Sequence, residues 1–169
     1  SYSKYAKEFF ERYTKNKDLL PLSSNMDEVF NNILDHSKSI IQGYILTQYY
    51  PKKNHISFSV CDLGIGIAKS VNNYLKSINE TKLEDWQAIT RATELGFSVK
   101  STPNNRGFGL NNILNMVEYS KGTLLIRSNK GYFFKQAGKN YSIGNMDVDF
   151  PGTLIKVRVD LNTFDEIDE

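Results

Sequence analysis

The chain has 169 residues, of which 40% are hydrophobic, and a formal net charge of +2. This length suffices for one globular domain that buries roughly 70% of the surface exposed by its unfolded chain. One cysteine, Cys61, excludes an internal disulfide, no apolar run approaches the ~18 residues of a membrane span, and the basic residues are spread along the sequence. We therefore expect a cytoplasmic protein without a membrane span or nucleic-acid binding, with Cys61 as a small core residue.

The first segment predicts a helix with one aromatic face. Tyrosine and phenylalanine recur at helical spacing between residues 2 and 13, with lysine and glutamate on the other side. We expect an N-terminal amphipathic helix within residues 1–20 that packs on its own domain. Dimerisation through this helix is the alternative.

A second amphipathic helix is predicted over Met26–Ile41, with Ser24–Asn25 as its cap. Glu28, Asn32 and Asp35 share its polar face, because steps of three and four residues return to one side of a helix. The Asn32 side-chain oxygen suits Mg²⁺, and Glu28 could orient or deprotonate a water or hydroxyl nucleophile. An ordinary solvated helix face is the alternative.

The next element is a strand that ends in a glycine-rich turn. Residues His55–Val60 alternate as in a strand with one buried face, so Asp62 emerges at the strand end. A carboxylate there can accept a hydrogen bond from the exocyclic amine of adenine, which would give selectivity for that base. Gly64 and Gly66 would let a flat ring approach the main chain, next to Ile67. The alternative is a simple surface turn.

Residues 67–106 form a long connection, which we interpret as a lid that closes over a ligand. Two weakly helical pieces are predicted within it, near Val71–Ile78 and Glu84–Leu95. Trp86 is expected to pack within this lid.

A second glycine-rich loop then opens another helix, over residues 111–120. Such a loop directs backbone N–H groups and the positive end of the helix dipole toward an anion, and basic side chains beside it add charge. We therefore predict phosphate binding here, with solvated basic side chains as the alternative. The residues assigned to it are Lys100, Arg106, Gly107, Phe108, Gly109 and Leu110.

The last part of the chain is predicted to form strands over Thr123–Ser128, Tyr132–Gln136 and Thr153–Leu161. The third alternates apolar and polar residues, as in an antiparallel sheet covered on one side. Lys130–Gly131 and Gly138–Asn140 are plausible hairpin turns.

Taken in order, these motifs resemble those of the GHKL ATPase superfamily, which includes gyrase B, the large heat-shock chaperone, histidine kinases and MutL. The resemblance covers residues 24–161 and implies a Bergerat-type α+β two-layer sandwich: a mixed, mostly antiparallel sheet covered by helices on one face, with ATP under the lid. Glu28 and Asn32 look like the N-box of this family. The first glycine box resembles Asp62, Gly64 and Gly66, and the second resembles Gly107, Gly109 and Leu110. Pro151–Thr153 look like the Gly-Thr box, in which the resemblance implies that Thr153 lies near adenine.

The resemblance implies an ATP- and Mg²⁺-binding domain over residues 21–163, followed by an acidic tail at 164–169. No histidine precedes the N-box to serve as a phosphoacceptor, and Glu28 is similar to the residue in hydrolysing members and anti-sigma serine kinases. We expect a kinase or ATPase module acting on an unidentified protein partner or phosphoacceptor. The alternatives are an ATP-gated interaction module with little catalysis and, less favoured, an inactive scaffold.

Overall fold

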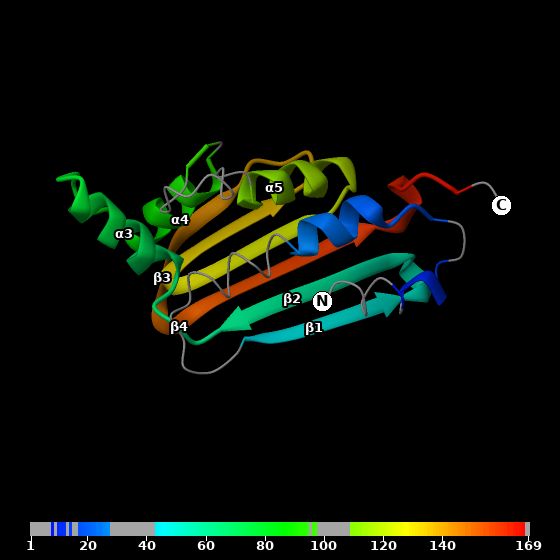
Figure 1. Cartoon of the computed structure of the whole chain (residues 1–169), viewed down its shortest axis with the longest axis horizontal. Helices are drawn as coiled ribbons and strands as arrows, with labels where there is room; N and C mark the ends of the chain where they lie inside the picture. Colours follow the sequence, from blue (N-terminus) through cyan, green and yellow to red (C-terminus); the bar gives the residue numbers. More distant parts are fainter. Residues whose placement is uncertain are drawn as a thin grey trace.

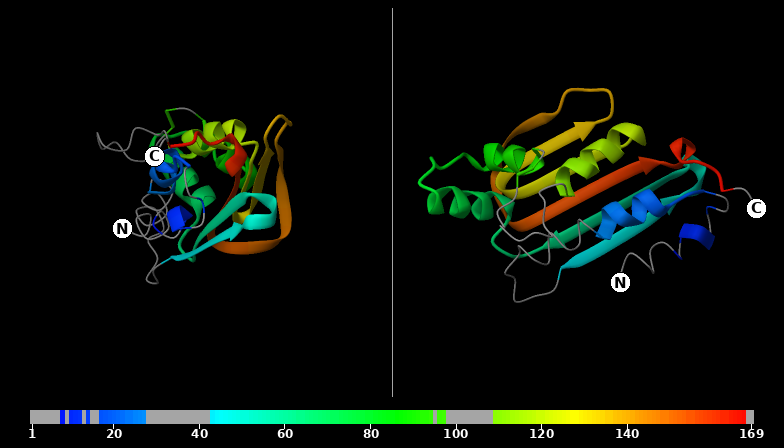
Figure 2. Two further views of the ribbon diagram at one scale, coloured as in Figure 1. Left: turned by 90° about the vertical axis from the view of Figure 1, so that its right-hand side faces the viewer. Right: turned by 45° about the horizontal axis from the view of Figure 1, so that its top comes forward.

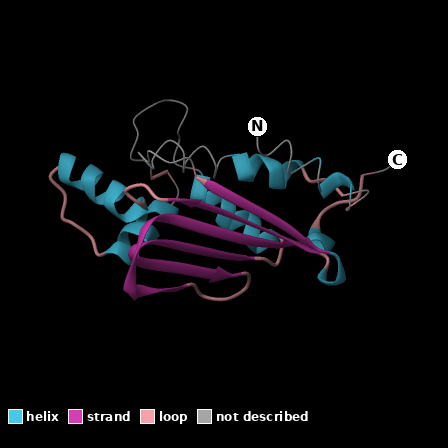
Figure 3. Ribbon diagram, turned by 90° about the horizontal axis from the view of Figure 1, so that it is seen from below, coloured by secondary structure: helices cyan, strands magenta, loops and turns pink. Residues whose placement is uncertain are grey.

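A four-stranded antiparallel sheet forms one layer of the protein, and helices cover one of its faces (Figures 1 and 3). The computed structural model describes residues 8, 10–12, 14, 17–27, 43–94, 96–97 and 109–167. The strand order is β1-β2-β4-β3, and the end view in Figure 2 shows sheet and helices as separate layers. The elements are β1 (Tyr44–Tyr50), η1 (Pro51–Lys53), β2 (His55–Asp62), α3 (Ile67–Ser77), α4 (Asp85–Thr93), α5 (Gly109–Tyr119), β3 (Thr123–Gln136), β4 (Ser142–Asp160) and η2 (Leu161–Thr163).

The core lies between the sheet and the helices, as the alternating strands predict. Every second residue of β2 is buried, and the partner residues of β4 follow the same alternation. The α+β class with one covered face is thus confirmed, and every strand pair among the described residues is antiparallel. The central side chains of this core are Ile56, Phe58, Val60, Leu124, Ile126, Ile155, Val157 and Val159.

The N-terminal region joins this same core. Phe10 is 1% exposed and packs in the main cluster together with Leu22 and Met26. Residues 20–27 are helical, so helical structure is already present before the predicted start at Met26, and residues 28–41 of that predicted helix lie outside the described residues. The predicted cap at Ser24–Asn25 is wrong, because the Asp18 side chain already accepts the Leu20 N–H at 2.9 Å.

Both helices predicted in the lid region are present, as α3 and α4. Four of their side chains, Ala68, Val71, Leu75 and Ala88, form a second small core between the two helices. The N-terminus of α4 rests on β3 at Gly131: an added Cβ there would lie 2.7 Å from the backbone of α4. Trp86, in α4, is half-buried. Beyond Phe97, the predicted lid lies outside the described residues.

The hairpin predicted at Lys130–Gly131 is wrong, because β3 continues through these residues with a bulge. Pairing with β4 shifts between Ser128 and Gly131, and Asn129 has a φ of 53°. Asparagine tolerates this left-handed conformation both in bulges and in turns, so the residue type alone does not distinguish a bulge from a hairpin turn. The chain does reverse at Gly138, between β3 and β4.

The face of the sheet opposite the helices is here called the open face. It carries the alternate side chains of each strand, which point away from the core. Cys61 lies on it and is half-exposed, so its prediction as a core residue is wrong: the inward position at the strand end belongs to Asp62. Among the described helices, none is long and apolar enough to cross a membrane.

Candidate functional site

Asp62 lies at the C-terminal end of β2 and faces the helices. Its position follows from the alternation of β2, which places it on the buried face after Val60. Asp62 is 3% exposed, and its Oδ1 accepts the Gly64 N–H at 2.6 Å. Thr153, its cross-strand partner in β4, donates its hydroxyl hydrogen to the carboxylate. The carboxylate is therefore buried and oriented from both sides.

Burial raises the pKa of Asp62, while the Gly64 N–H and the Thr153 hydroxyl partly oppose this shift. Burial dominates because few groups near the carboxylate replace the water that would solvate its charge. A further hydrogen-bond donor at this position would therefore stabilise the ionised form. The amine of a purine base is such a donor.

We expect the affinity for adenosine to fall as the pH is lowered. Because the pKa of Asp62 is raised, the fall should begin at a pH above 3.8, the ordinary pKa of an aspartate. The ionised carboxylate is the stronger acceptor, so affinity decreases by up to about tenfold per pH unit below the raised pKa. Folding responds in the opposite direction: because the folded pKa is raised, the contribution of Asp62 to stability is full at low pH and is lost as pH rises through it. Calorimetric titration with adenosine, which has no titrating phosphate, measures the first effect, and a flat profile would contradict it.

Two glycines bring the Asp62 loop and β4 into close contact. At Gly152, with a φ of 96°, an added Cβ would lie 2.1 Å from the Asp62 carbonyl oxygen. At Gly66, with a φ of 83°, an added Cβ would lie 2.6 Å from Ser128 Oγ and 2.7 Å from Asn129 Oδ1. Only glycine satisfies both the backbone angle and the spacing at these positions.

Hydroxyl groups from the sheet hold the first turn of α3. Thr153 Oγ1 accepts the Ile67 N–H at 3.2 Å, and Ser128 Oγ accepts the Ala68 N–H at 3.5 Å. Ser128 also donates its hydroxyl hydrogen to the Gly152 carbonyl at 3.0 Å. These two N–H groups at the start of α3 are thus bound to the protein itself and are not free to bind an anion. Thr153 links Asp62 to α3.

Two residues of this site, Ser128 and Asn129, were missed in the sequence. Asn129 Nδ2 donates to the Ile65 carbonyl at 3.4 Å, which supports the loop between Gly64 and Gly66. Its buried Oδ1 has no hydrogen-bond partner. The only signal was the Asn-Lys-Gly sequence, which is equally typical of a hairpin turn.

The structure brings together Asp62, Gly64, Gly66, Ile67 and Thr153 as predicted neighbours. Gly109 is buried and Leu110 is half-buried, and both belong to α5. No described contact joins these two residues to Asp62. The other predicted site residues lie outside the described residues: Glu28, Asn32, Asp35, Lys100, Arg106, Gly107 and Phe108.

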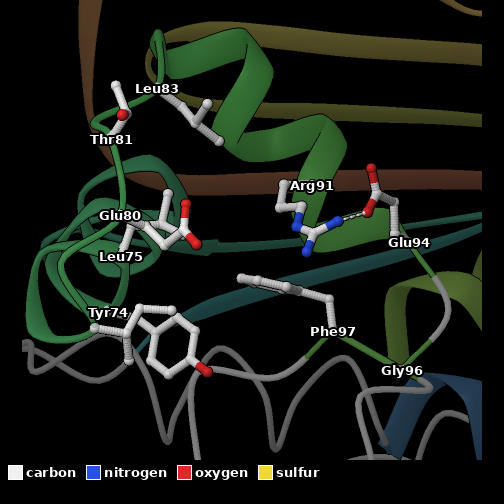
Figure 4. A pocket seen from close by; sticks show the side chains of 10 residues that line it. Tyr74, Leu75, Glu80, Thr81, Leu83, Arg91, Glu94, Gly96 and Phe97 are labelled. Carbon is white, nitrogen blue, oxygen red and sulfur yellow. Dashed lines mark hydrogen bonds and ion pairs between the residues drawn. The ribbon is translucent and has the colours of Figure 1, made fainter.

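A separate cavity of about 540 Å³ lies between α3 and α4, away from Asp62 (Figure 4). Arg91 forms an ion pair with Glu94 there and lies 5.1 Å from the centre of the Phe97 ring. None of the residues predicted to bind nucleotide lines it. The lining residues are Tyr74, Leu75, Ile78, Glu80, Thr81, Leu83, Arg91, Glu94, Gly96 and Phe97.

Most of the chain matches one known protein family. Residues 23–137 match the family described as the GHKL domain. The chain belongs to the GHKL domain family. The two segments that meet at Asp62, Gly66 and Gly152 are the loop after β2, which lies within the matched range, and the part of β4 around Gly152, which lies beyond it.

Among solved structures, the GHKL domain is similar to the ATPase region of Saccharomyces cerevisiae topoisomerase II. The identity is 14%, the TM-score is 0.48, and the match covers 86% of this chain but 40% of that one. The same region bound to ICRF-187 (dexrazoxane) matches at 14% identity with a TM-score of 0.49 and the same coverage. This chain thus spans less than half of those chains. None of the curated proteins compared with it matches in sequence.

Among the described residues, no group of three or more histidine, cysteine, aspartate or glutamate side chains is arranged to hold a metal ion. Mg²⁺ was predicted at Asn32, which lies outside this part of the chain.

Proposed function

We propose that the chain is an Mg²⁺-dependent ATP-binding domain that transfers the γ-phosphoryl group of ATP to a protein acceptor. One observation carries this proposal: a buried carboxylate, Asp62, is fixed by Gly64 and Thr153 beside a glycine contact that admits no side chain. Such an acceptor favours adenine, whose 6-amino group can donate to the carboxylate, over guanine, whose 6-carbonyl would place a second acceptor against it.

The remaining roles follow from the family resemblance and the motif positions. Asn32 would hold Mg²⁺, which supplies charge neutralisation to the phosphates when bound. Glu28 would orient the nucleophile, and the Gly107–Leu110 turn would bind phosphate at the start of α5. Catalysis of this kind rests on positioning and charge stabilisation, so turnover by the isolated domain would be slow. The cytoplasm is the compartment that supplies ATP and keeps the single cysteine reduced.

A second candidate is an ATP-gated interaction module, favoured by the bulge in β3. Asn129 in the bulge supports Ile65 of the glycine loop, and the next residue, Lys130, donates its backbone N–H to Asp85 of α4 at 3.0 Å. A nucleotide on the loop would therefore act on α4 through one short segment. The two functions differ in whether a partner is phosphorylated or only bound and released.

The test is calorimetric ATP binding with Mg²⁺, with GTP as the control, followed by transfer of labelled γ-phosphate. Glu28→Ala should preserve ATP affinity and lower turnover about 100-fold, because it removes only the group that assists the nucleophile. A Glu28→Ala variant with full turnover would disprove the role of Glu28. Binding of GTP as tight as that of ATP would disprove the site.

A further inference from the structure

The open face of the sheet has a regular arrangement of side chains. The register aligns Leu46 of β1 with Ser59 of β2, and Ser59 with Lys156 of β4. One step along, Gln48, Ser57 and Arg158 are aligned in the same way. A row of small side chains on β2 thus lies between longer ones on β1 and β4. No helix covers this face in the described structure (Figure 3).

Three basic side chains lie on this face. Arg127, Lys156 and Arg158 are exposed, and within the described part of the chain their side chains form no ion pair or hydrogen bond. In the regularly paired part of this face (44–50, 55–62, 123–128 and 153–160), Asp160 is the one described acidic residue that faces outward, and its carboxylate accepts the backbone N–H of Asn162 at 2.9 Å. Asp147 and Asp149 lie further along β4, opposite the bulge in β3. Since the whole chain has a net charge of only +2, the fold concentrates positive charge here. The sequence had suggested no such cluster.

The same face exposes apolar side chains next to the basic ones. Leu46 is 68% exposed and Tyr44 is 64% exposed, both on β1. Leu125 and Leu154 are half-buried on the two strands that carry the basic residues. A surface that combines unpaired positive charge with exposed aliphatic groups is typical of a protein-binding site.

We propose that the open face binds an acidic amphipathic helix of a protein partner. Its apolar side would cover Leu46 and the serine row, and its carboxylates would pair with Lys156 and Arg158. A helix laid on a sheet is a standard two-layer packing, and the charges would set its orientation and association rate.

Single-stranded nucleic acid fits the face less well. Its binding depends on aromatic rings free to stack on successive bases. Here Tyr50 and His55 pack against each other, with ring centres 4.5 Å apart, and Tyr44 stands at the other end of β1. The open-face positions of β1 between these two tyrosines hold Leu46 and Gln48, which are not aromatic. The face therefore lacks a continuous stacking surface.

His55, at the edge of the open face, reports on occupancy. Its pKa is lowered by burial and by the charges of Arg158 and Lys53, against the opposite effect of Asp160. Carboxylates of a partner placed beside Arg158 would offset that positive charge. The His55 pKa would then rise on binding, which a nuclear magnetic resonance titration can follow.

The probe is a labelled helical peptide of about 18 residues, with leucine at the i, i+3, i+4 and i+7 positions and glutamate elsewhere. Its binding to the whole chain is measured by fluorescence anisotropy, next to a Lys-for-Glu peptide and an oligothymidylate. Lys156→Glu with Arg158→Glu should weaken glutamate-peptide binding about tenfold. The control is the double variant Lys76→Glu with Lys82→Glu, at two exposed positions in α3 and in the loop after it. It changes the net charge by the same amount as the first pair and should leave binding unchanged.

Binding of the glutamate peptide, its loss in the first pair only and a raised His55 pKa would support the proposal. No binding, or equal loss in both pairs, would overturn it. Tighter binding of the oligothymidylate, lost in the same pair, would instead make the face a nucleic-acid site. ATP binding should be unaffected in all these variants, so failure here is distinct from failure of the nucleotide site.

Discussion

Replacing Asp62 by Asn is expected to weaken ATP binding about 1000-fold, or about 4 kcal/mol. Two effects add. The charge-assisted hydrogen bond from adenine to the carboxylate is lost, and the amide places an N–H donor against the amine of the base. Because Asp62 is buried beside Gly64 and Thr153, water cannot easily replace the lost partner. Calorimetry with ATP and Mg²⁺ measures the change.

The same variant should fold at least as stably as the wild type at neutral pH. Burial raises the pKa of Asp62, so its ionised form lowers the stability of the fold there, and a neutral amide removes that effect. Asp149→Asn, the same chemical change at an exposed position, is the matched control and should alter neither property. Wild-type affinity in Asp62→Asn would show that adenine binds elsewhere.

Replacing Gly152 by Ala is expected to lower the free energy of unfolding by about 4 kcal/mol. A φ of 96° costs an L-residue about 1–2 kcal/mol, and the new Cβ, 2.1 Å from the Asp62 carbonyl, must force the strands apart at a cost of about 1–3 kcal/mol. This is a large part of the stability of a typical domain. ATP affinity should fall as well, because the displaced carbonyl belongs to Asp62. Urea denaturation measures the first effect.

Gly138→Ala is the matched control for this substitution. Its φ of 71° imposes a similar backbone cost, but an added Cβ meets no atom within 4 Å. Its effect should therefore be about 1 kcal/mol, without a change in ATP binding. Equal destabilisation by the two substitutions would mean that backbone angle alone, and not contact with Asp62, determines the requirement for glycine at position 152.

The sequence predicted those parts of the fold and site that depend on local pattern. The alternation over His55–Val60 placed Asp62 on the buried face, and glycine spacing marked Gly64 and Gly66. The alternation of apolar and polar residues over the last predicted strand indicated that one face of the sheet is covered. These features can be read locally because side-chain direction in a strand is fixed by a period of two.

Features that depend on pairing between distant segments could not be predicted. Ser128 and Asn129 matter because the bulge in β3 places them under Gly66, and nothing near them in sequence indicates that neighbour. Likewise, Lys156 and Arg158 become part of one basic surface only when β4 pairs with its neighbours. Cys61 was misplaced because the strand end was treated as buried on both faces, whereas helices cover only one.

The contact between the first glycine box and β4 has a consequence for biosynthesis. Ile67 and Thr153, which share a hydrogen bond, are 86 residues apart, and Thr153 also orients Asp62. A nascent chain on the ribosome therefore cannot form the proposed adenine site when Asp62 emerges, because β4 is the last strand of the described sheet to be synthesised. Until then the loop after β2 lacks the Thr153 hydroxyl, which orients the Asp62 carboxylate, and Gly152, against which the loop packs. If Asp62 binds the base as proposed, nucleotide binding is acquired only after β4 has been synthesised and has paired with β2.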